Sequence, residues 1–224
     1  MEENLVTKKK FKFKLTDTLI LLGALIIMVV FFGLMEKSFF TYDNISSMLK
    51  NMVITGILAL GLTPLMIARG LDISFGANIS FTGVLMAVLY GKGLPLTLVL
   101  VIGVAAAGLI GLINGLLIEN FDLLPIILTL GIMSIFTAVA YVISDARSVS
   151  MLTDQLYYFA TKSFLKVPIP LFLLIVLIIV FWFILTFTKI GRIIYIIGAN
   201  PKVANLSGIK VKNVRIYLYT FMGL

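Results

Sequence analysis

The run Ile169-Pro-Leu-Phe-Leu-Leu-Ile-Val-Leu-Ile-Ile-Val-Phe-Trp-Phe-Ile-Leu-Thr-Phe-Thr188 contains no charged residue over twenty consecutive positions. At about 1.5 Å of rise per residue, a helix of roughly 20 residues crosses the roughly 30 Å hydrocarbon core of a bilayer. A helix also satisfies its own backbone hydrogen bonds, which a segment surrounded by lipid requires. Residues 169–188 are therefore predicted to form a membrane-spanning helix.

Similar apolar runs recur along the whole chain. Of its 224 residues, 61% are hydrophobic and only 12% are charged, and the mean hydropathy is +1.15, far from the composition of a soluble domain. A last run opens at Ile216 and stops at Leu224, so we expect the chain to be a fragment. These patterns predict an all-α, polytopic transmembrane helical bundle with six complete spans plus the start of a seventh. The other five complete spans are predicted at residues 19–35, 48–68, 73–90, 94–118 and 124–143.

The distribution of Lys and Arg predicts the orientation of these spans, because cytoplasmic flanks are enriched in both residues. With the basic segment 1–18 in the cytoplasm, alternation places twelve basic residues inside and six outside, which accounts for all 18. Residues 189–215 then lie in the cytoplasm, and residues 144–168 form the longest outer loop. The net charge of +8 is concentrated beside apolar runs, which favours contact with membrane lipid and argues against nucleic-acid binding. The inside set is Lys8, Lys9, Lys10, Lys12, Lys14, Arg69, Lys189, Arg192, Lys202, Lys210, Lys212 and Arg215, and the outside set is Lys37, Lys50, Lys92, Arg147, Lys162 and Lys166.

The residue inventory excludes several kinds of chemistry. The chain has no Cys and no His, so thiolate and imidazole metal sites, thiol redox centres and His-containing catalytic triads are ruled out. No catalytic residue, metal ligand or bound cofactor is predicted. The Gly-x-x-x-x-Gly-Lys-Ser/Thr loop of nucleotide-binding proteins is also missing from the sequence, so any nucleotide energy must come from another polypeptide.

The stretch 189–215 contains the signals of one short helix. Asn200 is a suitable N-cap, Pro201 fits the first helical position, and Gly208 suits a left-handed C-terminal cap. Val203, Leu206 and Ile209 would share its apolar face. Such a helix either rests on lipid headgroups or docks into the groove of a partner protein, and the residues alone leave both interpretations open.

The same stretch carries a motif: Gly191-Arg192-x-x-Tyr195-x-x-Gly198-x-Asn200-Pro201-x-x-Ala204-x-x-Ser207-Gly208-Ile209. It resembles the cytoplasmic motif of ribose-type permeases, a branch of the ABC importers. Two more segments agree in order and spacing: residues 69–76 resemble Gly-Gly-Ile-Asp-Leu-Ser-Val-Gly, and residues 114–118 with Pro125 and residues 129–131 resemble Asn-Gly-Leu-Leu and Pro-Phe-Ile-Ala-Thr-Leu-Gly. Arg69 and Phe75 depart from this pattern, where the family usually has small or aliphatic residues.

The resemblance implies a bacterial plasma-membrane permease, here residues 19–224, for a monosaccharide or related small polar solute. Its implied partners are cytoplasmic ATP-binding subunits that use ATP and Mg, an extracytoplasmic solute-binding protein and a second permease copy. Residues 189–215 would be the coupling loop that contacts the ATPase. The implied coupling residues are Gly191, Arg192, Gly198, Asn200, Pro201, Ala204, Ser207 and Gly208.

Asp72 is the acidic residue that most needs an explanation, because a lone charge at the centre of a membrane helix costs about 2.5–3.5 kcal/mol. One interpretation is a structural ion pair with Arg69, three residues away. The other is a helix interrupted by Pro64 and Gly70, with Asp72, Gly76 and Ser80 close to one stripe along a water-filled route. Together with the resemblance, this second interpretation predicts the pathway residues Gly70, Asp72, Ser74, Gly76, Asn78, Asn114 and Thr129.

Small residues at every fourth position of the run 94–118 predict that a neighbouring helix approaches closely there. They are Gly103, Ala107, Gly111 and Gly115. Asn114 lies beside them and either bonds across helices or faces the pathway.

Two further function classes stay open. The first is an ion-gradient-driven transporter or channel, with Asp72 as its acidic candidate. The second is a membrane enzyme, which would need a Ser-Lys or paired-carboxylate site. Against the enzyme, Glu119 and Asp122 are expected to be solvated charges in a short cytoplasmic turn.

Overall fold

The computed structural model describes residues 15–151, 153–164 and 167–224. The basic residues predicted to mark the cytoplasmic N-terminus, Lys8, Lys9, Lys10, Lys12 and Lys14, lie outside these ranges, as does Lys166. The chain divides into two compact units, residues 49–224 and the residues before them.

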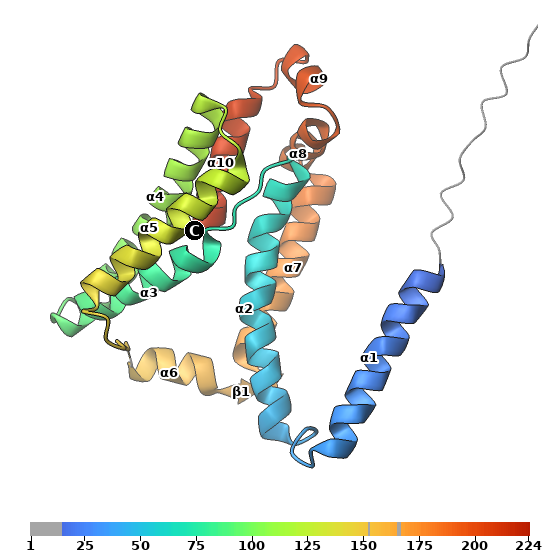
Figure 1. The fold of residues 1–224 in the computed structure, drawn as a ribbon, viewed down its shortest axis with the longest axis vertical. Coiled ribbons are helices and arrows are strands. Elements are labelled where there is room, and N and C mark those ends of the chain that lie inside the picture. The colour runs from blue at the N-terminus through green and yellow to red at the C-terminus, as the bar shows by residue number, and fades with distance from the viewer. Residues whose placement is uncertain (1–14, 152, 165–166) are drawn as a thin grey trace, which may run out of the picture. The chain divides into compact units, whose positions relative to one another are not determined.

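The described residues are mostly helical (Figure 1), which confirms the predicted all-α class. Strands β1 and β2 form a two-residue antiparallel pair, with Ser163 opposite Pro168. The elements are, in chain order, α1 (Leu15–Met35), α2 (Tyr42–Ile67), α3 (Phe75–Gly91), α4 (Leu96–Phe121), α5 (Pro125–Ile143), α6 (Asp154–Thr161), β1 (Ser163–Phe164), β2 (Val167–Pro168), α7 (Ile169–Phe187), α8 (Lys189–Ala199), α9 (Pro201–Leu206) and α10 (Val211–Gly223).

The first unit contains α1, a tight turn and the beginning of α2. Phe39 stacks on Phe32 with ring centroids 6.2 Å apart, and the ring of Phe40 lies against Gly33, where a larger side chain would clash. Aromatic packing of this kind and the hydrogen bonds from Ser38 to the Glu36 carboxylate stabilise the turn.

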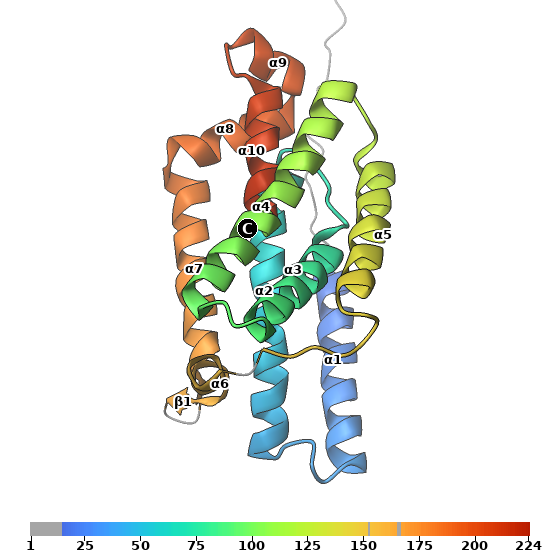
Figure 2. The ribbon, with the colours of Figure 1, turned by 90° about the vertical axis from the view of Figure 1, so that its left-hand side faces the viewer.

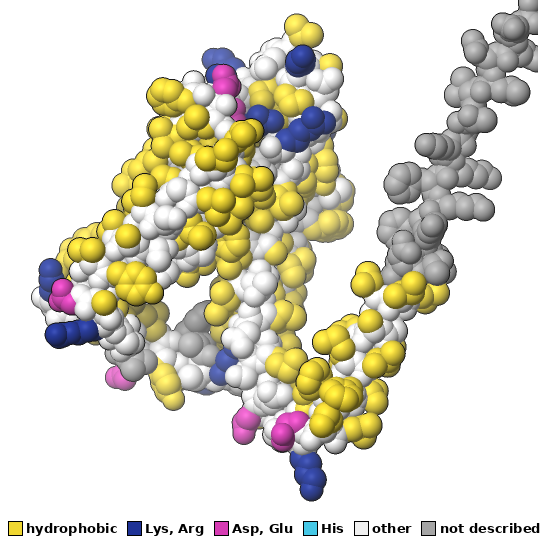
Figure 3. All heavy atoms as spheres, in the orientation of Figure 1, with side chains coloured by type: hydrophobic (Ala, Val, Ile, Leu, Met, Phe, Trp, Pro, Cys, Tyr) yellow, Lys and Arg dark blue, Asp and Glu magenta, His cyan; other side chains and the backbone are white. Residues whose placement is uncertain are grey.

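Four of the described helices are long and apolar enough to cross a membrane by length and composition: α2, α4, α5 and α7. Helix α3 and residues 19–35 of α1 are apolar but shorter. In Figure 3, hydrophobic side chains cover the flanks of the helices, and most charged side chains gather near helix ends. This pattern is that of a multi-pass membrane bundle. The predicted count of six complete spans and the cytoplasmic N-terminus stay predictions.

Helix α10 packs tightly against the small-residue stripe of α4, as the sequence predicts (Figures 1 and 2). Gly111 faces the carbonyl oxygen of Tyr219, and a Cβ at Gly115 would lie 2.9 Å from the Cα of Ile216. Gly103 instead accommodates the side chain of Met86 on α3. Without Cβ atoms in the way, the two backbones reach a distance that larger residues forbid.

Residues 189–215 contain more helix than the sequence predicts. The expected short helix is present as α9, but α8 precedes it and buries Gly191, Ile194 and Ile197. Helix α10 begins at Val211 rather than at Ile216. Arg215, one of the polar residues between these positions, contacts Ala68 and Glu119. A criterion based on apolar runs cannot detect such tertiary contacts.

The main core lies where the ends of α2, α4, α8, α9 and α10 meet. Tyr219, Ile197, Leu65 and Ala204 are fully buried there. The complete cluster is Leu65, Ala68, Ile118, Ile194, Ile197, Ala204, Val211, Leu218, Tyr219 and Met222.

Glu119 corrects one sequence-based expectation. It is not a solvated turn residue but lies in α4, 7% exposed, with its Oε1 3.5 Å from Nη1 of Arg215. Asp122 does lie at the exposed end of α4, in a left-handed conformation, 3.9 Å from Lys212. The buried charge of Glu119 is tolerated because a guanidinium from α10 compensates it.

The α4–α10 contact predicts that Gly111→Ala destabilises the protein. The new methyl group would meet the carbonyl oxygen of Tyr219, and such overpacking costs about 1–3 kcal/mol, or roughly 2–10 °C in thermal midpoint for a domain of this size. Gly131→Ala is the matched control, because no atom lies within 4 Å of the added Cβ. Thermal unfolding in detergent would contradict the packing if both variants behaved alike.

Candidate functional site

The segment between α2 and α3, residues 68–74, is not helical. Pro64 lies inside α2 and does not end it; the helix ends at Ile67, and Gly70 N donates to Leu65 O at 2.8 Å. Gly70 is required here because a side chain would strike Leu65 and approach the Tyr219 hydroxyl. Figures 1 and 2 show the segment returning from the end of α2 toward the middle of the helices, where α3 begins. The predicted helix interruption is therefore present, at Gly70 and not at Pro64.

Asp72 is 3% exposed and its carboxylate accepts three hydrogen bonds. Its Oδ1 accepts from the backbone N and the Oγ of Ser74 at 2.7 and 2.6 Å, and its Oδ2 accepts from Nδ2 of Asn114 at 3.1 Å. Asn114 also donates to Ser74 Oγ at 2.8 Å. The buried charge is thus stabilised by neutral donors from its own segment and from α4.

The alternative ion pair between Arg69 and Asp72 is not formed. Arg69 has a left-handed backbone conformation (φ 62°), and its side chain donates instead to Gly198 O and Ala199 O at 2.7 and 3.0 Å. The two residues therefore contact different elements. Asp72 contacts α4, and Arg69 contacts the end of α8.

Side chains from α5 and α10 form hydrogen bonds with backbone groups of the non-helical segment. The hydroxyl of Tyr219 accepts from Leu71 N at 3.2 Å and donates to Leu71 O at 3.3 Å, while Thr129 Oγ1 accepts from Ile73 N at 3.3 Å. Non-helical backbone inside a membrane protein needs partners of this kind, since lipid offers none. Tyr219 could not be assigned this role from sequence, because it lies 148 residues from Leu71 and in a run expected to be purely apolar.

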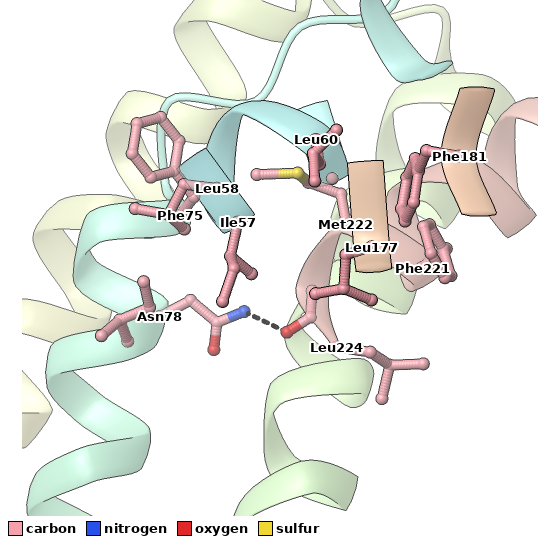
Figure 4. A pocket seen from close by; sticks show the side chains of 13 residues that line it. Ile57, Leu58, Leu60, Phe75, Asn78, Leu177, Phe181, Phe221, Met222 and Leu224 are labelled. Atoms are coloured by element: carbon pink, nitrogen blue, oxygen red, sulfur yellow. Dashed lines mark hydrogen bonds between the residues drawn. The ribbon is translucent and has the colours of Figure 1, made fainter. Parts of the chain in front are cut away.

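Asp72, Ser74 and Asn114 together form the Asp72 cluster. Asn78 lies on α3, outside this cluster, and lines a pocket of about 430 Å³ (Figure 4). Its Nδ2 donates to Ala107 O and Gly223 O at 3.2 and 3.1 Å. The rest of the lining is apolar, with Ile57 and Phe181 among the side chains. The Oδ1 atoms of Asn78 and Asn114 are buried without a hydrogen-bond partner in the described part of the chain, and such acceptors are rare in folded proteins.

Gly76 of the predicted pathway and Ser80 of the predicted stripe both lie apart from Asp72, Ser74 and Asn114. A Cβ added at Gly76, on α3, would have no atom within 4 Å, and Ser80 lines a different pocket beside Ser144. The predicted stripe of Asp72, Gly76 and Ser80 is wrong, because Asp72 precedes the helix that carries the other two. The structure brings together Asp72, Ser74 and Asn114, with Thr129 and Gly70 supporting the same segment.

The predicted coupling segment has the caps that the sequence predicts. Asn200 Oδ1 accepts from Lys202 N and Val203 N at 3.0 and 3.3 Å, and Gly208 adopts φ 83° at the other end. Ala204 is fully buried, whereas Leu206 is 89% exposed. Helix α9 is therefore anchored on one side and presents an apolar side chain on the other.

The remaining predicted coupling residues make contacts within the chain, and their coupling role stays a prediction. Gly191 and Gly198 lie against the backbone carbonyl oxygens of Leu185 and Ile67, where no side chain fits. Ser207 Oγ donates to Val203 O at 3.0 Å, and the exposed Arg192 donates to Phe187 O at 3.4 Å. Val203 is half-exposed beside Leu206, but Ile209 packs against the core instead of sharing their face.

Residues 44–224 match the family described as branched-chain amino acid transport system, permease component. The chain belongs to this permease family. It is 32% identical over 202 residues to the ribose import permease of Bacillus subtilis (strain 168), covering 89% of this chain and 63% of the relative. The D-allose transport system permease of Escherichia coli (strain K12) is 32% identical over 200 residues, with 89% and 61% covered.

A third relative, the autoinducer 2 import system permease of Escherichia coli (strain K12), is 31% identical over 216 residues, covering 92% of this chain and 64% of the relative. The chain thus spans less than two thirds of the length of these permeases. No solved structure matches it. Family membership and the apolar helices together identify a multi-pass membrane protein.

The Asp72 cluster predicts that Asn114→Ala is costly. It removes the Nδ2 donor and leaves a buried carboxylate short of a partner, a loss of roughly 2–4 kcal/mol. Asn51→Ala, at an exposed position of α2, is the matched control and should change little. Denaturant unfolding in micelles measures both.

The same cluster predicts coupling between Asp72 and Asn114. In an Asp72→Asn background, Asn114→Ala should cost about 1 kcal/mol less than in the natural protein, because an amide needs fewer donors than a carboxylate. Additive effects of the two substitutions would show that Asn114 does not stabilise the charge.

Proposed function

We propose that the chain is the membrane-spanning permease part of an ATP-driven, binding-protein-dependent ABC importer for a monosaccharide or a related small polar solute. The relatives named above are, by name, import or transport permeases for ribose, D-allose and autoinducer 2. The chain itself carries no covalent chemistry in this proposal. Its partners are cytoplasmic ATP-binding subunits, which use ATP and Mg, an extracytoplasmic solute-binding protein and a second permease copy.

The observation that carries this proposal is the geometry of α9. A six-residue helix has little stability of its own, yet α9 is capped at both ends and held by the fully buried Ala204. Leu206, at 89% exposure, and Val203, at 51%, project from this fixed base. A rigid short helix with an outward apolar contact suits docking into a groove of a partner protein.

The Asp72 cluster supports the choice of a polar solute. It places a carboxylate, a hydroxyl and an amide side by side in the interior of the bundle, where Asp72, Ser74 and Asn114 meet. The buried acceptor oxygens of Asn78 and Asn114 add hydrogen-bonding capacity that the described residues leave unused. Sugar hydroxyls are donors and acceptors of the right kind for such groups. Alternation between outward- and inward-open states would expose this cluster to each side in turn.

A gradient-driven carrier is a weaker account of the same cluster. A Na⁺ site needs several oxygen ligands directed at one point. Asn114 instead turns its Nδ2 donor toward both Asp72 and Ser74. The cluster in this conformation is arranged around a carboxylate that accepts hydrogen bonds, not around a cation.

Replacing Leu206 tests the docking directly. In the full-length gene product, Leu206→Asp should abolish co-purification of the ATP-binding subunit, because a charge would be buried at the contact. Leu206→Met should retain it. Since the Leu206 side chain is almost fully exposed, neither change should alter folding, whereas substitutions of the buried Ala204 would.

Phe164→Asp is the matched control, an equally polar change at an exposed aromatic residue of β1. It should leave co-purification unchanged. If the ATPase accompanies Leu206→Asp as well as the natural protein, α9 is not the docking helix. If no ATPase accompanies any of the proteins, the importer proposal itself fails.

A further inference from the structure

Arg69 connects two elements that lie far apart in the sequence. It follows α2 directly, in a left-handed conformation, and its guanidinium reaches the last two carbonyl groups of α8. The Nε–Gly198 O and Nη2–Ala199 O distances are 2.7 and 3.0 Å. Nearby, Gly198 lies directly against the carbonyl oxygen of Ile67, so the two helix ends also touch through their backbones.

The contact supplies hydrogen-bond donors to the C-terminal carbonyl groups of α8. The last carbonyl groups of a helix lack partners within the helix and carry the negative end of its dipole. A guanidinium offers several donors in a fixed planar arrangement, so one side chain can bind two such carbonyls at once. Arg69 thus acts as a C-terminal cap for α8, supplied by another element.

The contact between Arg69 and α8 lies between α9 and the segment that carries Asp72. On one side, Asn200 ends α8 and also caps the N-terminus of α9, so α8 and α9 meet at a single residue. On the other side, Asp72 lies three residues after Arg69, on the same non-helical segment. A short and continuous set of contacts therefore connects α9 with Asp72.

A second arginine, Arg215, also contacts the turn at residues 68–70. Arg215 Nε donates to Ala68 O at 3.0 Å, and its Nη1 lies 3.5 Å from Glu119 on α4. Arg215 is half-buried, whereas Arg69 is exposed. The turn at residues 68–70 is thus held by two contacts. One is made by the half-buried Arg215 of α10, which also contacts Glu119 of α4, and the other is the exposed contact of Arg69 with α8.

We propose that Arg69 is a positioning residue that transmits movement of the coupling helix α9 to the Asp72 segment. This inference rests on the proposed function, because it assigns the route by which an ATPase bound at α9 acts on the solute pathway. Arg69 itself contacts neither the ATPase nor the solute in this account. Its exposed hydrogen bonds contribute little to stability, so their loss should weaken coupling more than folding.

The test uses the full-length permease with its ATPase and binding protein in proteoliposomes, and measures solute uptake per ATP hydrolysed. Arg69→Gln keeps a polar side chain but loses the charge and the planar two-carbonyl contact. We expect the ATPase to co-purify and hydrolyse ATP as before, while uptake per ATP falls about five-fold or more. Arg147→Gln, which removes an exposed charge from the loop after α5, should leave the ratio unchanged.

Arg69→Lys separates transmission from folding. Lysine restores the charge but not the paired geometry, so uptake per ATP should lie between the values for the natural protein and Arg69→Gln. An unchanged ratio in both monodisperse variants would overturn the inference. If Arg69→Gln does not fold, Arg69→Lys decides alone, and failure of both to fold would make Arg69 a stabilising contact instead. Uptake by the natural protein without ATP would overturn the proposed function, a different result from any of these.

Discussion

The buried carboxylate of Asp72 is the constraint on which the centre of this structure depends. An uncompensated charge in a membrane interior costs several kcal/mol, and Asp72 is compensated by Ser74 and Asn114 without a cation from the described residues nearby. Asp72 and Ser74 lie where the helix is interrupted between α2 and α3. The interruption in turn exposes backbone groups, which Tyr219 and Thr129 satisfy from α10 and α5. The contacts around this one polar group thereby link α2, α3, α4, α5 and α10.

Close packing of α4 and α10 makes this arrangement possible. Gly111 and Gly115 let α10 approach until the hydroxyl of Tyr219 reaches the segment at Leu71. The same approach brings Arg215 between Glu119 and Ala68, at the end of α2. The small residues of α4, the Glu119–Arg215 ion pair and the Tyr219 hydroxyl therefore stabilise one arrangement together. In the proposed transmission, Arg69 lies in a turn that Arg215 also holds. Such coupling needs two discrete arrangements of the segment, one for each accessible side of the membrane.

Local signals in the sequence were sufficient for most of the elements and insufficient for the contacts. Gly70, the caps at Asn200 and Gly208, and the stripe at Gly111 and Gly115 could be predicted because each follows from the chemistry of one residue or one period. The partners of Arg69 and Glu119 could not, because nearest neighbours in sequence suggested Asp72 for the first and solvent for the second. The actual partners lie 129 and 96 positions away along the chain. Helix α8 and the early start of α10 were missed for the same reason, since tertiary contacts permit polar residues that interrupt an apolar run.

In the proposed function, ATP drives a permease of this architecture, and transport in a reconstituted system measures this dependence. The full-length gene product, its ATP-binding subunits and its binding protein would be placed in proteoliposomes with ribose, D-allose and autoinducer 2 as trial solutes. We expect uptake of one such solute that requires ATP on the side of the ATPase and persists when proton and sodium gradients are dissipated. Uptake that follows an ion gradient and ignores ATP would contradict it.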